Sequence, residues 1–203
     1  MDRTLIHSIL SSPSNPPPKK YDFIVKYSKS IGYVTKRPYV DEFLEYLKEN
    51  NFEIVIFTAG DKSYASLLLD ILDPKGLISH RLYRDSCKSF QGNLVKDLSC
   101  LGRNLNNVVI VDDNPHYTIL QRKNAIRIRP LTDDLQDHEL RKLMNDFFKE
   151  CNRYNNMQDA VKHYRHAARV QHNREKLTRS SKQARVFEDE EYGLLKFIYL
   201  DDQ

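Results

Sequence analysis

Two adjacent carboxylates, Asp112 and Asp113, stand directly after an apolar run at residues 109–111. This pattern predicts a buried strand that delivers a pair of acids to the edge of a sheet. Carboxylate oxygens are hard ligands of the kind that Mg²⁺ takes, and a bound divalent cation neutralises phosphate oxygens. The pair therefore indicates phosphate chemistry with a divalent cation.

Polar side chains also stand at other places where strands are expected to end. Thr58 closes the apolar run at residues 54–57, and Lys96 follows a short strand-like run. Asp2 and Thr4 stand at the start of the chain. The ammonium group of a lysine at such a position could neutralise a phosphoryl oxygen, so these residues extend the same chemistry.

The elements that would position these groups alternate along the chain. Strands are expected at residues 21–25, 31–35, 53–58, 108–112 and 125–128, with a short hairpin within residues 83–96. Helices are expected from Arg37-Pro38 onward and over residues 62–72 and 137–151, and the Pro-rich residues 11–20 predict a loop. Such alternation predicts an α/β fold, a parallel sheet flanked by helices, with reactive groups just past the carboxyl ends of its strands.

Composition limits the remaining possibilities. The 203 residues are 40% hydrophobic, which suits one sizeable core and a tail, and the three cysteines form no close pair that would predict a disulfide framework or a zinc ribbon. No run approaches the ~18 apolar residues of a membrane span, and no secretion signal is present. Residues 162–185 carry eight Lys or Arg against the single acid Glu175. Aromatic residues do not alternate with these charges along the run, so nucleic acid is not an expected partner.

Several segments in matching order resemble the haloacid dehalogenase superfamily, and specifically its FCP-homology branch of small phosphatases that act on the C-terminal domain of RNA polymerase II. They are Lys36-Arg-Pro38, Phe57-Thr-Ala59, residues 81–87, residues 95–99, residues 109–115 and residues 124–130. The resemblance covers roughly residues 1–165 and leaves residues 166–203 as a charged helical tail. It implies a Rossmann-like parallel sheet with small hairpin insertions and no large cap.

The resemblance also implies roles for individual residues. The first motif of the family is Asp-x-Asp-x-Thr, in which the first Asp attacks phosphorus and the second is general acid and then base. Asp2 and Thr4 match the second Asp and the Thr, so Asp2 would be the acid and base. The nucleophile would directly precede Met1, outside the sequence, and Arg3 stands at a position that is usually acidic in close relatives.

Phosphate and metal ligands follow from the other motifs. Thr58 and Lys96 would bind the phosphoryl group, and Arg84 and Tyr64 would lie near the substrate phosphate. Mg²⁺ would be held by the following oxygen ligands: Asp112, Asp113 and the main-chain carbonyl of Asp2.

We therefore expect a Mg²⁺-dependent protein serine/threonine phosphatase that lacks its first strand and nucleophile, as in an incomplete gene model or a truncated form. The chain as printed would show little or no turnover, and its sheet would have a central gap with unpaired backbone groups. Short insertions leave the site open, which favours phosphoserine in an extended Ser-Pro segment, such as the RNA polymerase II C-terminal domain.

Two alternatives come from other functional classes. The first is a pseudophosphatase that binds phosphopeptides or partner proteins without hydrolysing them. The second is an interaction domain, as in the family's relative in mitochondrial protein import, but no transmembrane segment or transit peptide supports it. A monomer is favoured, and the nucleus and the cytoplasm are the expected locations.

Overall fold

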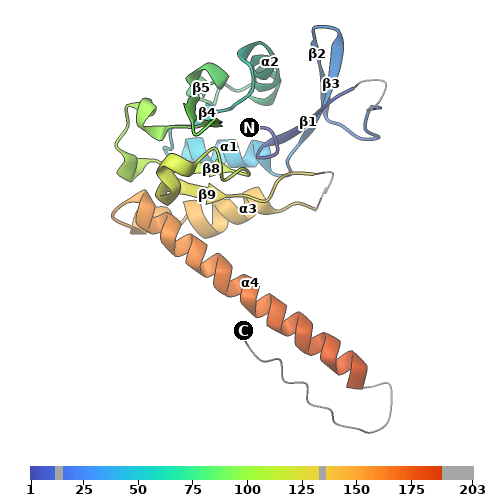
Figure 1. Cartoon of the computed structure of the whole chain (residues 1–203), viewed down its shortest axis with the longest axis vertical. Helices are drawn as coiled ribbons and strands as arrows, with labels where there is room; N and C mark the ends of the chain where they lie inside the picture. The colour runs from blue at the N-terminus through green and yellow to red at the C-terminus, as the bar shows by residue number, and fades with distance from the viewer. Residues whose placement is uncertain (12–15, 133–135, 189–203) are drawn as a thin grey trace. The chain divides into compact units, whose positions relative to one another are not determined.

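The computed structural model describes residues 1–11, 16–132 and 136–188. The chain divides into two units, Met1–Tyr164 and Arg165–Gln203, and every strand of the described residues lies in the first (Figure 1). Within the described residues, no helix combines the length and apolar character needed to cross a lipid bilayer.

The first three strands form an antiparallel sheet in the order β1-β3-β2. The predicted hairpin is confirmed as β2 (Phe23–Tyr27) and β3 (Ser30–Lys36). Strand β1 (Ile6–Leu10) was not predicted, because its sequence Ile-His-Ser-Ile-Leu is short and polar in the middle, and its pairing with β3 defines it. Of the predicted loop, residues 12–15 lie outside the described part.

Two parallel strand pairs confirm the predicted α/β fold. One pair is β4 (Val55–Phe57) with β5 (His80–Leu82), and the other is β8 (Ile110–Asp112) with β9 (Ala125–Arg127). They are separate two-stranded sheets and not one continuous sheet. Asp112 ends β8 and Thr58 directly follows β4, as the sequence predicts.

The helices lie close to their predicted positions. They are α1 (Val40–Glu49), α2 (Lys62–Leu72) and α3 (Glu139–Leu143), which continues as the π-helical turn η5 (Met144–Phe148). The prediction that α1 opens at Arg37-Pro38 was wrong by two residues. Tyr39 has a left-handed backbone (φ 67°) and precedes the first helical residue, so the proline lies in a turn before the helix.

The insertions between Thr58 and Lys96 are short, as predicted. They comprise α2, β5 and a hairpin of β6 (Lys88–Phe90) and β7 (Asn93–Val95). Gln91 and Gly92 both have positive φ (50° and 77°), which is the backbone of a tight two-residue hairpin turn. Short 3₁₀ segments make other connections: η1 (Arg84–Ser86), η2 (Leu98–Leu101), η3 (Leu105–Asn107), η4 (Ile119–Asn124) and η6 (Cys151–Arg153).

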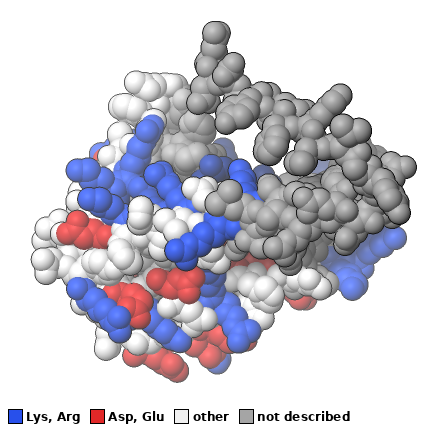
Figure 2. Space-filling view, turned by 90° about the horizontal axis from the view of Figure 1, so that it is seen from below, with Lys and Arg blue, Asp and Glu red and all other residues white. Residues whose placement is uncertain are grey.

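The core of the first unit joins the buried faces of α1, α2 and α3 to the strands. The residues with no exposed surface include Ile6, Val34, Ala65, Leu68, Leu69 and Leu140. The last helix, α4 (Met157–Glu188), begins in this unit, where Ala160 and Val161 are buried in the same core. On the described part of the face in Figure 2, Lys and Arg are interspersed with Asp and Glu, in keeping with a net charge of only +4.

Candidate active site

The centre of the candidate site is a buried ion pair between two predicted residues. Lys96 donates from Nζ to Oδ2 of Asp112 at 2.5 Å, and each side chain is only 4% exposed. Oδ1 of the same carboxylate accepts a hydrogen bond from the Asn114 backbone at 2.9 Å. Buried charges are retained where they are paired and hydrogen-bonded, so both groups are held in fixed positions.

The second carboxylate of the pair contacts the start of the chain. The Thr4 hydroxyl donates to Oδ1 of Asp113 at 3.3 Å. Asp2, two residues earlier, uses Oδ1 to accept hydrogen bonds from the backbone N–H groups of Arg3 and Ser8, both at 3.1 Å. The structure thus brings Thr4, two residues after Asp2, into contact with Asp113, which directly follows β8.

Thr58 and Arg84 lie at the carboxyl end of β4. The Thr58 side chain is buried, and its Oγ1 accepts a hydrogen bond from the Gly60 backbone at 3.0 Å, which fixes the turn after the strand. Arg84 donates from Nε to the Ala59 carbonyl at 2.7 Å, with its side chain 54% exposed. A buried hydroxyl and an exposed guanidinium therefore share this edge.

Tyr64 lies under the hairpin of β2 and β3. Its ring packs edge-to-face on Tyr27, and an added Cβ at Gly32 would come within 2.8 Å of its hydroxyl. That hydroxyl is buried and has no hydrogen-bond partner among the described residues. Burial raises the pKa of Tyr64, Ser8 lowers it and the charge of Asp2 raises it.

Sequence reasoning missed two residues of the site. The Lys96 ammonium lies 4.9 Å from the ring centroid of Tyr117, whose pKa is raised by burial first and then by Asp112. The Cys87 thiol lies 3.9 Å from the Thr58 carbonyl, and burial raises its pKa although Lys96 and Arg84 lower it. No local pattern marks a lone Tyr or Cys, so only the fold reveals these neighbours.

The α-amino group of Met1 lies in the electrostatic field of the site residues. Burial lowers the pKa of its α-amino group to about 5, and Lys96 lowers it further. Asp112, Asp2 and Asp113 act in the opposite direction. Charges of both signs from the site residues therefore act on this end of the chain.

This arrangement suits a hard divalent cation. No cluster of three or more acidic, His or Cys side chains that could hold a metal occurs among the described residues, so a cation here would need main-chain or water oxygens as well. The expected ligands, Asp112, Asp113 and the Asp2 carbonyl, would form such a mixed set of oxygens. Mg²⁺ commonly keeps several waters and takes one or two carboxylates, so the residues present fit it.

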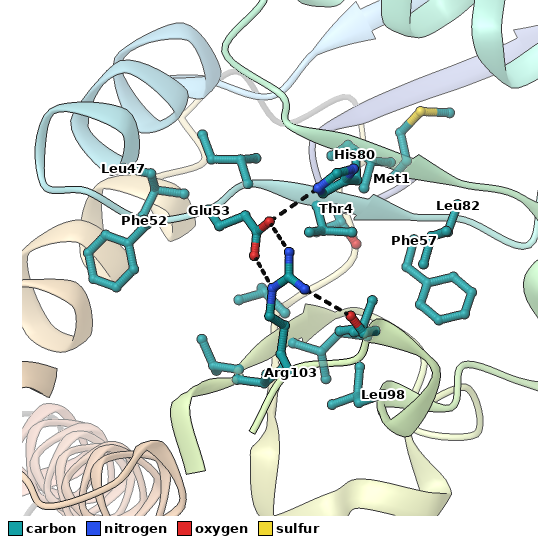
Figure 3. Close-up of a pocket in the computed structure, with 18 of the residues that line it drawn as sticks. Met1, Thr4, Leu47, Phe52, Glu53, Phe57, His80, Leu82, Leu98 and Arg103 are labelled. Carbon is teal, nitrogen blue, oxygen red and sulfur yellow. Dashed lines mark hydrogen bonds and ion pairs between the residues drawn. The ribbon is translucent and has the colours of Figure 1, made fainter. Parts of the chain in front are cut away.

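A cavity of about 620 Å³ separates the two parallel strand pairs (Figure 3). Residues 53–57 line one wall and residues 108–111 another, while Phe43, Leu44 and Leu47 of α1 contribute apolar side chains. Within the described chain, β4 pairs only with β5 and β8 only with β9, so each has an edge without a strand partner. A gap of this kind was expected in the sheet.

A charged cluster borders the cavity near the amino ends of β4 and β5. Arg103 donates from Nε to Oε2 of Glu53 at 2.8 Å and from Nη2 to Oε1 at 2.7 Å, and His80 lies 3.2 Å from Oε1 (Figure 3). Hydrogen bonding to Arg103 lowers the pKa of Glu53. Met1 and Thr4 line the same cavity, so it runs from this cluster toward the site.

Comparison with a solved structure identifies the fold. The structure matches the fission yeast RNA polymerase II CTD phosphatase Fcp1 bound to beryllium fluoride, with a TM-score of 0.51 and 22% identity. The match covers 89% of this chain and 65% of that one. The fold is therefore the haloacid dehalogenase-like α/β fold, as the sequence predicted.

The sequence comparisons identify the family. The family model described as NLI interacting factor-like phosphatase matches residues 1–160, and the chain belongs to this family. A probable C-terminal domain small phosphatase of Dictyostelium discoideum is 45% identical over 71% of this chain and 46% of its own length. A human CTD small phosphatase-like protein is 43% identical over 75% of this chain and 54% of its own. The chain thus spans about half the length of these relatives.

Proposed function

We propose that this chain forms the catalytic domain of a Mg²⁺-dependent phosphoprotein phosphatase. The observation that carries the proposal is the buried Lys96–Asp112 pair beside the Asp113–Thr4 contact, at the edge where two strands end. A human relative, 38% identical over 80% of this chain, is named as a small phosphatase for the C-terminal domain of an RNA polymerase II subunit. We infer that this chain acts on the same substrate class, phosphoserine in Ser-Pro segments. We therefore infer that it acts in the nucleus.

Each residue of the site has its own role in the proposed reaction. The Thr58 hydroxyl and the Lys96 ammonium bind phosphoryl oxygens, and the exposed Arg84 meets the substrate phosphate at the mouth of the site. Asp112, Asp113 and the Asp2 carbonyl would hold Mg²⁺, which when bound neutralises charge on the phosphoryl group. These fixed charges stabilise the transition state without reorganising during the reaction.

Asp2 transfers protons in both halves of the proposed reaction. A carboxylate two positions before Asp2 forms a bond to phosphorus while the bond from phosphorus to the serine oxygen breaks, and Asp2 gives its proton to that oxygen. Asp2 then takes a proton from the water that attacks the aspartyl phosphate, which releases inorganic phosphate and the carboxylate.

We further propose that the cavity between β4 and β8 receives the strand that carries this nucleophile. Two strand edges and an apolar lining support a β-strand as the occupant, and about five residues would extend roughly 16 Å along the cavity. A strand that enters beside Glu53 and Arg103 and ends at Met1 would bring its last side chain to the site. It would run parallel to β4 and β8.

The test extends the chain before Met1 with four Val, Ile or Leu residues followed by Asp, and the control ends in Asn. Both extensions should raise the melting temperature, because each fills the cavity and pairs the strand edges. Only the Asp form should hydrolyse a phosphoserine-proline peptide with Mg²⁺.

The outcomes separate the proposals. Stabilisation by both extensions without turnover would contradict the phosphatase, and peptide binding in that case would favour the pseudophosphatase. An unchanged melting temperature would contradict the strand site.

A further inference from the structure

The most completely bonded polar side chain of the described core is Arg37, which has no role in the chemistry above. Its side chain has no exposed surface. Nε donates to Oδ1 of Asp137 at 2.9 Å and Nη2 donates to Oδ2 at 2.7 Å. Nη1 donates to the carbonyls of Arg3 at 3.3 Å and Thr4 at 2.9 Å, and Nη2 also donates to the Arg129 carbonyl at 2.5 Å. A guanidinium has five N–H donors, and all five are used.

Two of these bonds hold the segment that carries Asp2. The Arg3 carbonyl accepts a second hydrogen bond from the Leu131 backbone at 2.7 Å, and the backbone N–H of Arg37 donates to the Leu5 carbonyl at 2.9 Å. Three consecutive carbonyls, those of Arg3, Thr4 and Leu5, are therefore fixed by Arg37. Each lies within three residues of the proposed acid and base.

This segment needs external support because its backbone is strained. Arg3 has a φ of 57°, in the left-handed region that non-glycine residues rarely adopt. Such a conformation persists where the surrounding structure fixes it. The hydrogen bonds from Arg37 and Leu131 to the carbonyl of this same residue supply that restraint.

Asp137 in turn anchors the guanidinium. Its side chain is 2% exposed, and its Oδ1 also accepts a hydrogen bond from the Glu139 backbone at 2.9 Å, at the start of α3. Burial alone would raise the pKa of Asp137, but hydrogen bonds and charge from Arg37 lower it overall. The carboxylate therefore stays ionised and ties Arg37 to α3.

We infer that Arg37 is a positioning residue that, anchored by Asp137, holds the backbone of residues 3–5 so that the Asp2 carboxyl can reach the leaving oxygen of the substrate. The inference deepens the proposed function and rests on it for its kinetic consequence. We call the hydrogen bonds from Arg37 to the carbonyls of residues 3–5 the clamp. Its effect on the backbone can be measured without turnover.

The shape of the guanidinium makes the inference specific. A lysine at this position keeps the positive charge near Asp137 but has three donors on one nitrogen, so it cannot reach the carbonyls of residues 3, 4 and 129 together. Arg37→Lys therefore keeps the positive charge but loses the set of hydrogen bonds that fixes the backbone of residues 3–5. Asp137→Asn is the second variant, because it weakens the anchor and leaves Arg37 in place.

The matched control is Asp73→Asn. Asp73 is also a buried carboxylate, and its oxygens accept hydrogen bonds from the backbones of Leu77 and Ile78 at 2.8 and 2.9 Å, after α2. This substitution weakens a comparable set of bonds in another part of the unit. Losses caused by lower overall stability should therefore appear equally in the control.

The first measurement is amide hydrogen exchange on the full chain. Arg37→Lys and Asp137→Asn should lower the protection of residues 3–6 and of the Leu131 amide by about 10-fold or more relative to the rest of the unit. Asp73→Asn should leave that ratio unchanged. Equal protection of residues 3–6 in Arg37→Lys and the parent would overturn the clamp.

The second measurement compares two leaving groups in the chain extended with the Asp-ending strand. A serine oxygen needs a proton to leave, whereas the p-nitrophenolate of p-nitrophenyl phosphate does not. A displaced Asp2 should lower kcat/KM for a phosphoserine peptide by about 10-fold or more relative to p-nitrophenyl phosphate, because full general acid catalysis contributes about 10²–10⁴-fold. Equal losses on both substrates would show a purely structural role.

The two measurements distinguish a failure of the proposed function from a failure of the inference about Arg37. If the extended parent hydrolyses neither substrate, the proposed function is wrong, and the exchange result alone decides whether Arg37 clamps residues 3–5. If the parent is active and only the exchange changes, the clamp exists but does not position the acid, and the inference is wrong.

Discussion

The ammonium of Lys96 lies 2.5 Å from the carboxylate of Asp112, and each side chain is only 4% exposed. Removal of one member of a buried pair leaves the other charge without compensation, at a cost of about 3–5 kcal/mol. Lys96→Met should therefore lower the free energy of unfolding by about that amount in urea titrations with EDTA.

The double variant Lys96→Met with Asp112→Asn should recover most of this loss, because it removes both charges. Lys88→Met is the matched control, since Lys88 pairs with Asp97 while its own side chain is 57% exposed. A loss in Lys96→Met no larger than that in Lys88→Met would contradict the burial of the pair.

Thr58→Val should impair phosphate binding in the extended chain. The substitution keeps the shape of the side chain but removes the hydroxyl, so kcat/KM for a phosphoserine peptide should fall by about 10²-fold or more, as when one preorganised donor is lost. Thr58→Ser keeps the hydroxyl and should retain most of the activity. Equal activity of the Val and Ser variants in steady-state assays would remove Thr58 from the site.

Asp97 should make stability sensitive to acid. Its carboxylate accepts hydrogen bonds from the side chain of Lys88, the Ser99 hydroxyl at 2.7 Å and the Gln121 amide at 2.8 Å, and these bonds, with Lys88 first, lower its pKa well below the ordinary value of 3.8. A lowered pKa in the folded state means that the stabilisation is complete above the unfolded value and is lost as pH falls toward the folded one.

Asp97→Asn should consequently reduce the free energy of unfolding by about 2 kcal/mol at pH 7, the scale of hydrogen bonds to a charged group. The difference from the parent should shrink as the pH falls below about 4, where the unfolded carboxyl becomes protonated. Urea unfolding at a series of pH values measures this difference. A gap that stays constant from pH 7 to pH 3 would show that the Asp97 contacts do not depend on its charge.

The sequence predicted the elements whose signal is local. The apolar runs before Thr58 and Asp112 identified β4 and β8, because a buried strand needs apolar side chains wherever it lies. Strand β1 gave no such signal, since its pairing with β3 and not its own pattern defines it. The start of α1 was misplaced because a proline suits both a first helical turn and the turn that precedes it.

The sequence identified which residues belong to the site, but it did not show which of them contact one another. Lys96 and Asp112 were both identified, but their pairing spans 16 residues and depends on how two segments after different strands meet. Arg37 was noted for the proline beside it and as part of the segment Lys36-Arg-Pro38 that resembles the family, but no role was predicted for its side chain. Its burial depends on Asp137, 100 residues away, and no local pattern carries that information.

Mg²⁺ should stabilise the chain through Asp112 and Asp113, a readout that does not require turnover. A ligand that binds only the folded state at 100 times its Kd adds about 2.7 kcal/mol to the free energy of unfolding. Saturating Mg²⁺ should thus raise the urea midpoint of the parent, and EDTA should reverse the effect. Asp113→Ala should abolish this increase because it removes one of the two carboxylates.

Thr4→Val separates the metal from the local contact, because it removes the hydroxyl that donates to Asp113 and leaves both carboxylates in place. This variant should start from a lower stability than the parent and still gain about as much from Mg²⁺. If Asp113→Ala gains as much from Mg²⁺ as the parent does, the cation binds elsewhere and the assignment of Asp113 as its ligand is wrong.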